Sequence, residues 1–147
     1  TQGGYIYLRD TDPALFTYSP QGGRYPAAQH PNGATLGPVG LFPGGPQSTP
    51  ARPTQIIVLY GTGFGATNPP VNPSTFFMGS APLAVDHNDI RVQVGGLNGQ
   101  VQYIGLIAPG LYQINLVLPA LVDGEYFINA DIDGMTTQPG LRIAIKE

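Results

Sequence analysis

Cysteine and tryptophan are absent from this chain of 147 residues, and charged residues make up only 10% of it. Without cysteine, neither a disulfide nor a thiolate metal site can form. No apolar run reaches the roughly 18 residues that a membrane-spanning helix needs, so we expect no membrane insertion. Six Lys+Arg against nine Asp+Glu give a net charge of −3, with no basic run. Nucleic-acid binders usually carry a basic surface, so we expect no nucleic-acid partner.

Glycine and proline are abundant, with 21 and 16 residues respectively. That composition excludes a helical bundle or coiled coil, which would need Ala, Glu, Lys and Leu in their place. A hydrophobic content of 41%, with eight Tyr and six Phe, favours a folded chain over a disordered one. The length predicts one domain, residues 1–147.

The second half of the chain has the alternation and turn residues of β-strands. Ile90–Val94 places Ile and Val on one face and Arg and Gln on the other. The turn residues 95–99 predict an antiparallel hairpin that joins this strand to residues 101–103. Further strands are predicted at residues 55–60, 111–118, 125–132 and 141–145. This pattern predicts a sandwich or a barrel, and the chain length favours an all-β, immunoglobulin-like β-sandwich.

The core strands are thus expected within residues 53–147, and residues 1–52 are expected to be looser. Edge strands are predicted at residues 4–8 and 14–18. Six prolines between Pro31 and Pro53 predict an extended or polyproline-like loop over the sandwich. Alternatively, residues 1–52 are partly a linker from a preceding domain. Residues 1–10 lack the features of a signal peptide, which leaves open that both ends are cuts from a longer precursor.

Gly61–Gly65 follows a predicted strand and has the glycine spacing of a phosphate-binding loop. Pro69 and Pro70 prevent the helix that such a loop needs, and no Lys-Ser/Thr pair is present. We expect these glycines to form a turn, with Phe64 closing one end of the sandwich. The hydroxyl of Tyr112 is expected to anchor on the backbone.

The densest polar cluster is Asp86–Asp89, which Asp131 or Asp133 joins if the loops meet. Oxygen ligands on loops favour calcium as the ion for such a site. The simpler interpretation is a polar turn before the Ile90 strand, so we expect no metal site.

The sequence also predicts no catalytic or cofactor-binding residue, and no enzyme. His30 is predicted to lie on the surface, no Gly-x-Ser-x-Gly elbow occurs, and nothing indicates a cleft between paired carboxylates. All four serines lie in loops flanked by proline or glycine: Ser19, Ser48, Ser74 and Ser80.

Aromatic side chains outside the well-patterned strands support carbohydrate binding as an alternative, because β-sandwiches can bind sugars through exposed rings. These candidates are Tyr5, Tyr7, Tyr18, Tyr25, Phe76 and Phe77.

Four segments carry a resemblance to a known family: residues 60–71, 92–96, 101–105 and 109–115. The series resembles the uncharacterised C-terminal domain of secreted and surface proteins from Solibacter and related acidobacteria. Gly61–Gly65 followed by Val-x-Val-Gly-Gly is more distantly similar to IPT/TIG immunoglobulin-like domains. The resemblance implies an exported β-sandwich at the end of larger proteins, with no known activity. Residues 76–83 depart from it, because they are more aromatic than the usual polar spacer.

Lys146 is the sole lysine, and neutral polar residues supply most of the remaining polarity. Exported bacterial modules often have this composition, so we expect an extracellular or cell-surface location. The function expected is a non-enzymatic structural or interaction module that contacts neighbouring domains or another protein. Binding of a glycan is the alternative.

Overall fold

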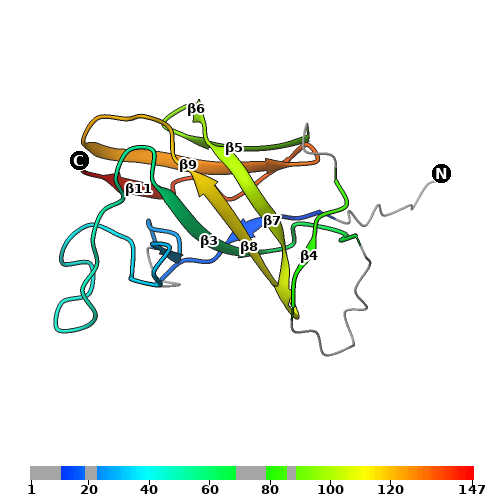
Figure 1. Cartoon of the computed structure of the whole chain (residues 1–147), viewed down its shortest axis with the longest axis horizontal. Helices are drawn as coiled ribbons and strands as arrows, with labels where there is room; N and C mark the ends of the chain where they lie inside the picture. Colours follow the sequence, from blue (N-terminus) through cyan, green and yellow to red (C-terminus); the bar gives the residue numbers. More distant parts are fainter. Residues whose placement is uncertain (1–10, 19–22, 69–78, 86–88) are drawn as a thin grey trace, which may run out of the picture.

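The computed structural model describes residues 11–18, 23–68, 79–85 and 89–147, and it contains no α-helix within them (Figure 1). The strands form two antiparallel sheets, which pack face to face as a β-sandwich. The predicted all-β fold is confirmed, while the immunoglobulin-like topology stays a prediction. Within the described ranges, no helix is present that has the length and hydropathy to cross a bilayer.

The first sheet has the strand order β1-β3-β8-β7-β4, and β2 also pairs with β3. The second has the order β10-β9-β5-β6, and β11 also pairs with β9. The strands of the first sheet are β1 (Ala14–Leu15), β2 (Ala28–Gln29), β3 (Ile56–Thr62), β4 (Ala81–Pro82), β7 (Gln100–Ala108) and β8 (Leu111–Val117). Those of the second are β5 (Ile90–Val94), β6 (Leu97–Asn98), β9 (Gly124–Ile132), β10 (Met135–Thr136) and β11 (Arg142–Ile145).

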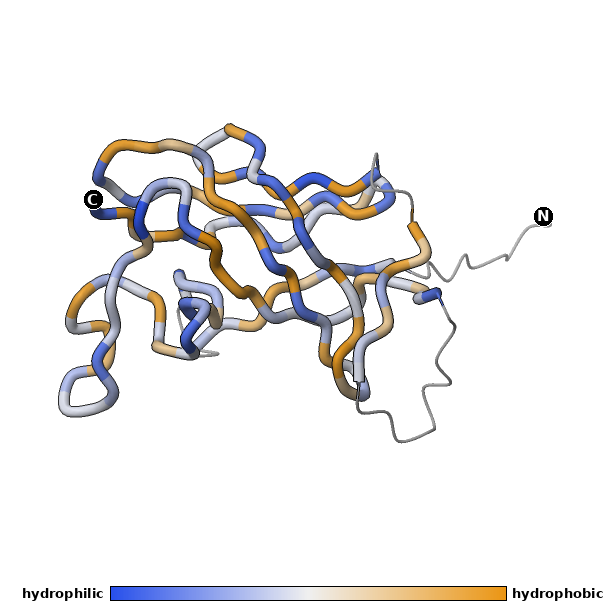
Figure 2. Tube along the Cα trace, viewed as in Figure 1, coloured by the Kyte–Doolittle hydropathy of each residue, from blue (hydrophilic) through white to orange (hydrophobic). Residues whose placement is uncertain are grey.

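The core lies between the two sheets because apolar side chains alternate with polar ones along the long strands. Figure 2 shows this alternation of hydropathy along the chain trace. Each fully buried aliphatic side chain contributes about 1.5–3 kcal/mol to folding, so this layer dominates the stability. Its members from the long strands include Ile57, Leu59, Ile114, Leu116, Ile128, Ile132, Val92 and Val94, all almost fully buried.

The predicted hairpin between residues 90–94 and 101–103 is wrong. Strand β5 pairs instead with β6, through a two-residue turn at Gly95 and Gly96. Both glycines have positive φ, 61° and 80°, which a type I′ turn requires. The chain then crosses to the other sheet at Gly99, where an added Cβ would lie 2.6 Å from Leu116 Cδ1. Strand β7 therefore pairs with β8 and not with β5.

Residues 24–52 lie against both sheets. Strand β2 pairs with β3. The Ala51 N–H donates to Ala144 O in β11, and Ala51 O accepts from the N–H of Lys146, which follows β11, both at 2.9 Å. Leu36 and Ala51 are buried in the core, whereas residues 43–47 are exposed. The predicted strand at residues 14–18 is shorter, two residues long, and the one at 4–8 lies outside the described residues.

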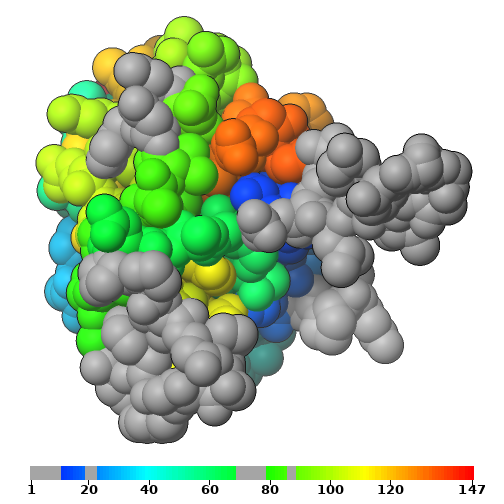
Figure 3. All heavy atoms as spheres, turned by 90° about the vertical axis from the view of Figure 1, so that its right-hand side faces the viewer, coloured from blue at the N-terminus to red at the C-terminus, as the bar shows by residue number. Residues whose placement is uncertain are grey.

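The side chain of Gln138 joins the two sheets at one end of the sandwich. Its amide donates to the backbone oxygen of Leu15 and its carbonyl accepts from the Leu15 N–H, at 2.6 and 2.9 Å. Figure 3 shows the start of the described chain, in blue, next to the orange segment that the colour bar places after residue 130. The short strand β1 is thereby held against both layers.

Thr54 is expected to be strained, because its φ of 63° lies in the left-handed region that β-branched residues avoid. It lies in the turn that Gln55 N–H closes on Arg52 O at 3.1 Å. We expect Thr54→Gly to raise the free energy of unfolding by about 0.5–1 kcal/mol, since a left-handed conformation costs a Cβ-bearing residue about 1–2 kcal/mol and glycine gives part of that back as entropy. Urea denaturation measures the change.

The matched control for this prediction is Thr62→Gly in β3, where φ is not positive. It should lower the stability by about 0.5–1 kcal/mol, as glycine does inside a strand. Equal losses of stability in both variants would show that the Thr54 backbone is not strained.

Candidate functional site

The outer face of the second sheet presents a row of side chains along its central strand, β9. Alternate residues of β9 point to opposite faces. Ile128, Ala130 and Ile132 are buried, whereas Phe127, Asn129 and Asp131 lie on the outer face. One outer position of the strand is therefore aromatic and the next two are polar.

Phe127 forms the aromatic end of this row and is 59% exposed. Arg142 pairs with it across β9 and β11, and its guanidinium carbon lies over the ring, 5.0 Å from the centroid. Glu125 approaches the Arg142 guanidinium at 4.0 Å and accepts a hydrogen bond from the Tyr25 hydroxyl at 2.9 Å. Burial raises the pKa of Tyr25, and the Glu125 carboxylate raises it further. These contacts fix the position of the ring.

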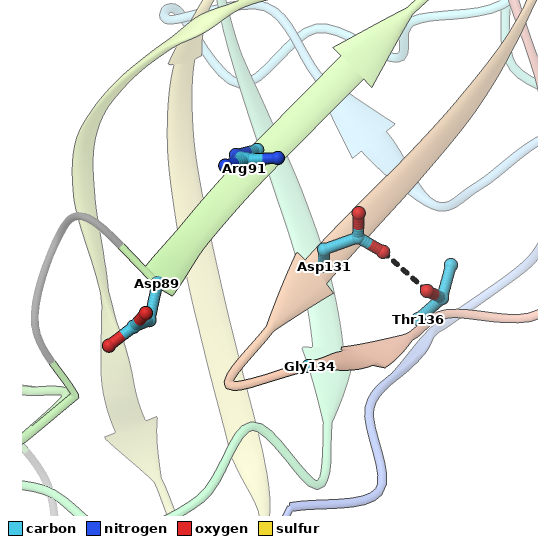
Figure 4. A pocket seen from close by; sticks show the side chains of 5 residues that line it. All are labelled: Asp89, Arg91, Asp131, Gly134 and Thr136. Atoms are coloured by element: carbon cyan, nitrogen blue, oxygen red, sulfur yellow. Dashed lines mark hydrogen bonds between the residues drawn. The ribbon is translucent and has the colours of Figure 1, made fainter.

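The polar end of the row borders a cavity of about 280 Å³, lined by Asp89, Arg91, Asp131, Gly134 and Thr136. Arg91 pairs with Asp131 in the register of β5 and β9, and Asp131 accepts a hydrogen bond from the Thr136 hydroxyl. Figure 4 shows Arg91 on β5 above the two aspartates, with Asp131 turned toward Thr136 and Asp89 turned away. No ion pair or side-chain hydrogen bond of Arg91 to another described residue is formed.

A second cavity, of about 340 Å³, lies between these two ends. Phe127 and Asn129 line it from β9, and Pro139 lines it from the following loop. Thr136 borders both cavities, so the two meet at this residue. We use the name β9 track for the surface formed by Phe127, Asn129 and Asp131 of β9 together with Arg91 of β5 and Thr136 of β10.

The polar cluster singled out in the sequence is only partly described. Asp86, His87 and Asn88 lie outside the described residues. Asp89 and Asp131 line the same cavity, whereas the Asp133 side chain is not part of its lining. Among the described residues, no three His, Cys, Asp or Glu side chains come together in a way that could hold a metal ion.

Of the six rings proposed for sugar binding, the structure describes Tyr18 and Tyr25, and both make contacts within the protein. The Tyr18 hydroxyl lies within hydrogen-bond distance of Ala28 O and of Leu36 O, the latter at 2.9 Å, and its one proton is shared between them. Its ring meets Phe42 edge-on at 5.0 Å. Tyr25 supports Glu125 as described above. The other four lie outside the described residues: Tyr5, Tyr7, Phe76 and Phe77. Two exposed rings among the described residues, Phe127 and Phe16, were not among the six candidates, and Phe127 is the more exposed.

We expect Tyr18→Phe to lower the free energy of unfolding by about 1–3 kcal/mol at neutral pH, because the Leu36 and Ala28 backbone groups lose their partner. Burial raises the pKa of Tyr18 above its ordinary value of 10.0. The contribution of the Tyr18 hydroxyl to stability is therefore complete below pH 10.0, and it is lost as the pH rises through the higher pKa of the folded state. Urea denaturation at neutral and at alkaline pH should show a shallower alkaline decline in the variant.

A control at neutral pH is Tyr126→Phe, which removes an exposed hydrogen bond from the hydroxyl to Val122 O. Its loss should be below about 1 kcal/mol, since water replaces the partner. A Tyr18 variant no less stable than this control would contradict the structural role of Tyr18.

His30 joins two loops at the other end of the molecule. Its Nε2 lies 2.8 Å from Thr49 Oγ1, and its Nδ1 lies 2.7 Å from Gln55 Nε2. Gln55 Oε1 in turn accepts from the Arg52 N–H at 2.8 Å. Both ring nitrogens are thus engaged in holding the loops, and the histidine lines an open cavity of about 460 Å³.

The glycine-rich segment after β3 is filled by the protein itself. Phe64 is fully buried, with its ring centroid 5.1 Å from that of Tyr112. The Tyr112 hydroxyl donates to Gly65 O at 2.7 Å, and burial raises its pKa. The predicted anchor of Tyr112 is confirmed, and Phe64, which was predicted to close one end of the sandwich, is buried. Gly63 approaches the backbone of Asp12 so closely that no side chain fits between them.

Comparison of the chain with family models, with curated proteins and with solved structures finds no match. The resemblance to the acidobacterial C-terminal domain therefore stays a prediction.

Proposed function

We propose that this chain is a non-enzymatic structural or interaction module of an exported or cell-surface bacterial protein. Its contact surface is the outer face of the second sheet, centred on Phe127. The partner is a neighbouring domain of the same protein or another molecule at the cell surface.

The observation that carries this proposal is the exposure of Phe127 together with its fixed position. Of the two phenylalanines that are exposed among the described residues, Phe127 is the more exposed, at 59%, and it lies on a central strand. Arg142 over the ring, and the Glu125 and Tyr25 groups behind Arg142, favour one orientation of the ring before any partner arrives. Aromatic residues and arginine are enriched where proteins make contacts, and a preorganised contact loses less entropy on binding.

The composition supports the exported location, because the chain has a single lysine, Lys146, and only 10% charged residues. The resemblance described above supports the same location and a place within a larger protein.

Carbohydrate binding is the second candidate, and the β9 track is the observation that favours it. The track replaces the rings proposed from the sequence, since Tyr18 and Tyr25 are held by contacts within the protein.

Photo-cross-linking in the producing bacterium tests the proposed contact surface. We expect 4-benzoylphenylalanine at position 127 of the full protein to cross-link to a partner. The control position is Phe16, an aromatic residue that is 40% exposed and precedes β2. Cross-linking at position 16 alone, or specific turnover of an ester, glycoside or phosphate ester by the purified chain, would contradict the proposal.

A further inference from the structure

We propose that the β9 track binds a neutral oligosaccharide, with Phe127 as the stacking platform and Arg91, Asn129 and Asp131 as the hydroxyl-binding groups. This inference rests on the proposed function, since it names the ligand of the same surface.

The backbone of β9 is not available to a ligand. Residues Ile128–Ile132 pair with β5 on one side, and β10 and β11 both pair with β9 along the other. An extended peptide that adds a strand to a sheet needs free backbone N–H and C=O groups at an edge. A ligand on this face must therefore be recognised by side chains.

The side chains of the track offer both donors and acceptors. Arg91 presents N–H donors, and neither it nor the Asn129 amide forms a side-chain hydrogen bond with another described residue. Asp131 keeps acceptor capacity beyond its bond from Thr136. A sugar hydroxyl both donates and accepts, so neighbouring hydroxyl groups suit a surface that alternates amide, carboxylate and guanidinium groups.

Phe127 supplies the apolar part of the site. The C–H-bearing face of a sugar ring packs on an aromatic face. Arg142 covers one face of the Phe127 ring, so the sugar would pack on the opposite face of this 59% exposed side chain. Phe127 and Asp131 are four residues apart on one strand, which corresponds to about 14 Å. The ring and the polar groups therefore suit an extended ligand of more than one sugar unit.

The charges of the track favour a neutral ligand over an acidic one. At the polar end, two carboxylates, Asp89 and Asp131, and one guanidinium, Arg91, line the same cavity. At the aromatic end, Arg142 is balanced by Glu125. A phosphate group or an acidic polysaccharide would meet a net negative surface at the polar end and would be repelled.

The test is isothermal titration and affinity electrophoresis of the purified chain against a defined panel. The neutral members are oligosaccharides and polymers of β-glucan, α-glucan, xylan, mannan and chitin, and the acidic members are pectate and alginate. We expect at least one neutral saccharide to bind. Phe127→Ala should weaken that binding about tenfold or more, through loss of the stacking area. Arg91→Gln should weaken it about threefold to tenfold, through loss of the charged donors.

Phe16→Ala is the matched control, because it removes another exposed ring from outside the track. It should change the affinity by less than about twofold, which is smaller than the change expected from the loss of one hydrogen bond. Phe127 and Arg91 are both exposed, so urea denaturation should show that these variants keep their fold.

Failure of this inference can be told apart from failure of the proposed function. If no neutral saccharide binds, or if Phe16→Ala weakens binding as much as Phe127→Ala, the saccharide assignment is overturned. If in that case position 127 still cross-links to a protein, the contact surface stands and its partner is that protein. If position 127 yields no cross-link either, both proposals fail.

Discussion

Phe64→Ala is expected to lower the free energy of unfolding by about 3–5 kcal/mol, which is a large share of the stability of a domain of this size. Phe64 is fully buried and stands next to the Tyr112 ring, whose hydroxyl anchors the same segment at Gly65. Removing the ring loses its burial and leaves a cavity at the end of the sandwich. Chemical denaturation followed by circular dichroism measures the loss.

Two controls define this effect. Phe127→Ala makes the same chemical change on the surface and should cost less than about 1 kcal/mol. Phe64→Leu fills most of the cavity and should cost less than half of the loss in Phe64→Ala. A loss below about 1 kcal/mol in Phe64→Ala would show that the ring does not close the core.

Gly63→Ala is the second substitution with a large expected effect, a loss of about 3 kcal/mol or more. The φ of Gly63 is 73°, and an added Cβ would lie 2.1 Å from Asp12 O. The backbone would have to move and break the Asp12 N–H bond to Gly63 O, which measures 2.8 Å. The penalty therefore combines an unfavourable φ, a steric overlap and a lost hydrogen bond.

Gly96→Ala separates these contributions. Gly96 also has a positive φ, 80°, but nothing lies within 4 Å of an added Cβ. Only the conformational penalty remains, about 1–2 kcal/mol. Similar losses in the two variants would show that the close approach of Gly63 to Asp12 is not present in solution.

The strands with clear alternation could be predicted from the sequence. Ile90–Val94 was predicted with the bounds that the structure has, and the strand predicted at residues 111–118 ends one residue earlier. These strands bury one face each, so the period of two in hydropathy is strong. The Tyr112 anchor could be expected from the chemistry of tyrosine, because a buried hydroxyl needs a hydrogen-bond partner.

The pairing of β5 could not be predicted in the same way. Strand β6 consists of Leu97 and Asn98 alone, and both are exposed, so no hydropathy pattern distinguishes it from a turn. Gly95-Gly96 is the signal that a two-residue turn was present, and Gly99 marks the crossing to the other sheet. Such a crossing depends on how the two layers pack, which local patterns do not contain.

The candidate site was missed for a related reason. Tyr126 and Phe127 are adjacent aromatic residues in a well-patterned strand, so only one of them can face the core and the other lies on the outer face. Tyr18 lies outside the strong strands, yet hydrogen bonds from Ala28 and to Leu36 hold it within the protein. Position in a loop did not predict exposure, because the loop itself packs on the sheets.

Nuclear magnetic resonance titration of the labelled chain tests most directly whether the outer face of β9 is the contact surface. The ligand is the saccharide of the panel with the highest affinity. We expect the largest shifts at the Asn129 side-chain amide, the Arg91 Nε–H and the Phe127 ring. Shifts confined to the cavity around His30, or the absence of any shift with every saccharide of the panel, would contradict a saccharide site on β9.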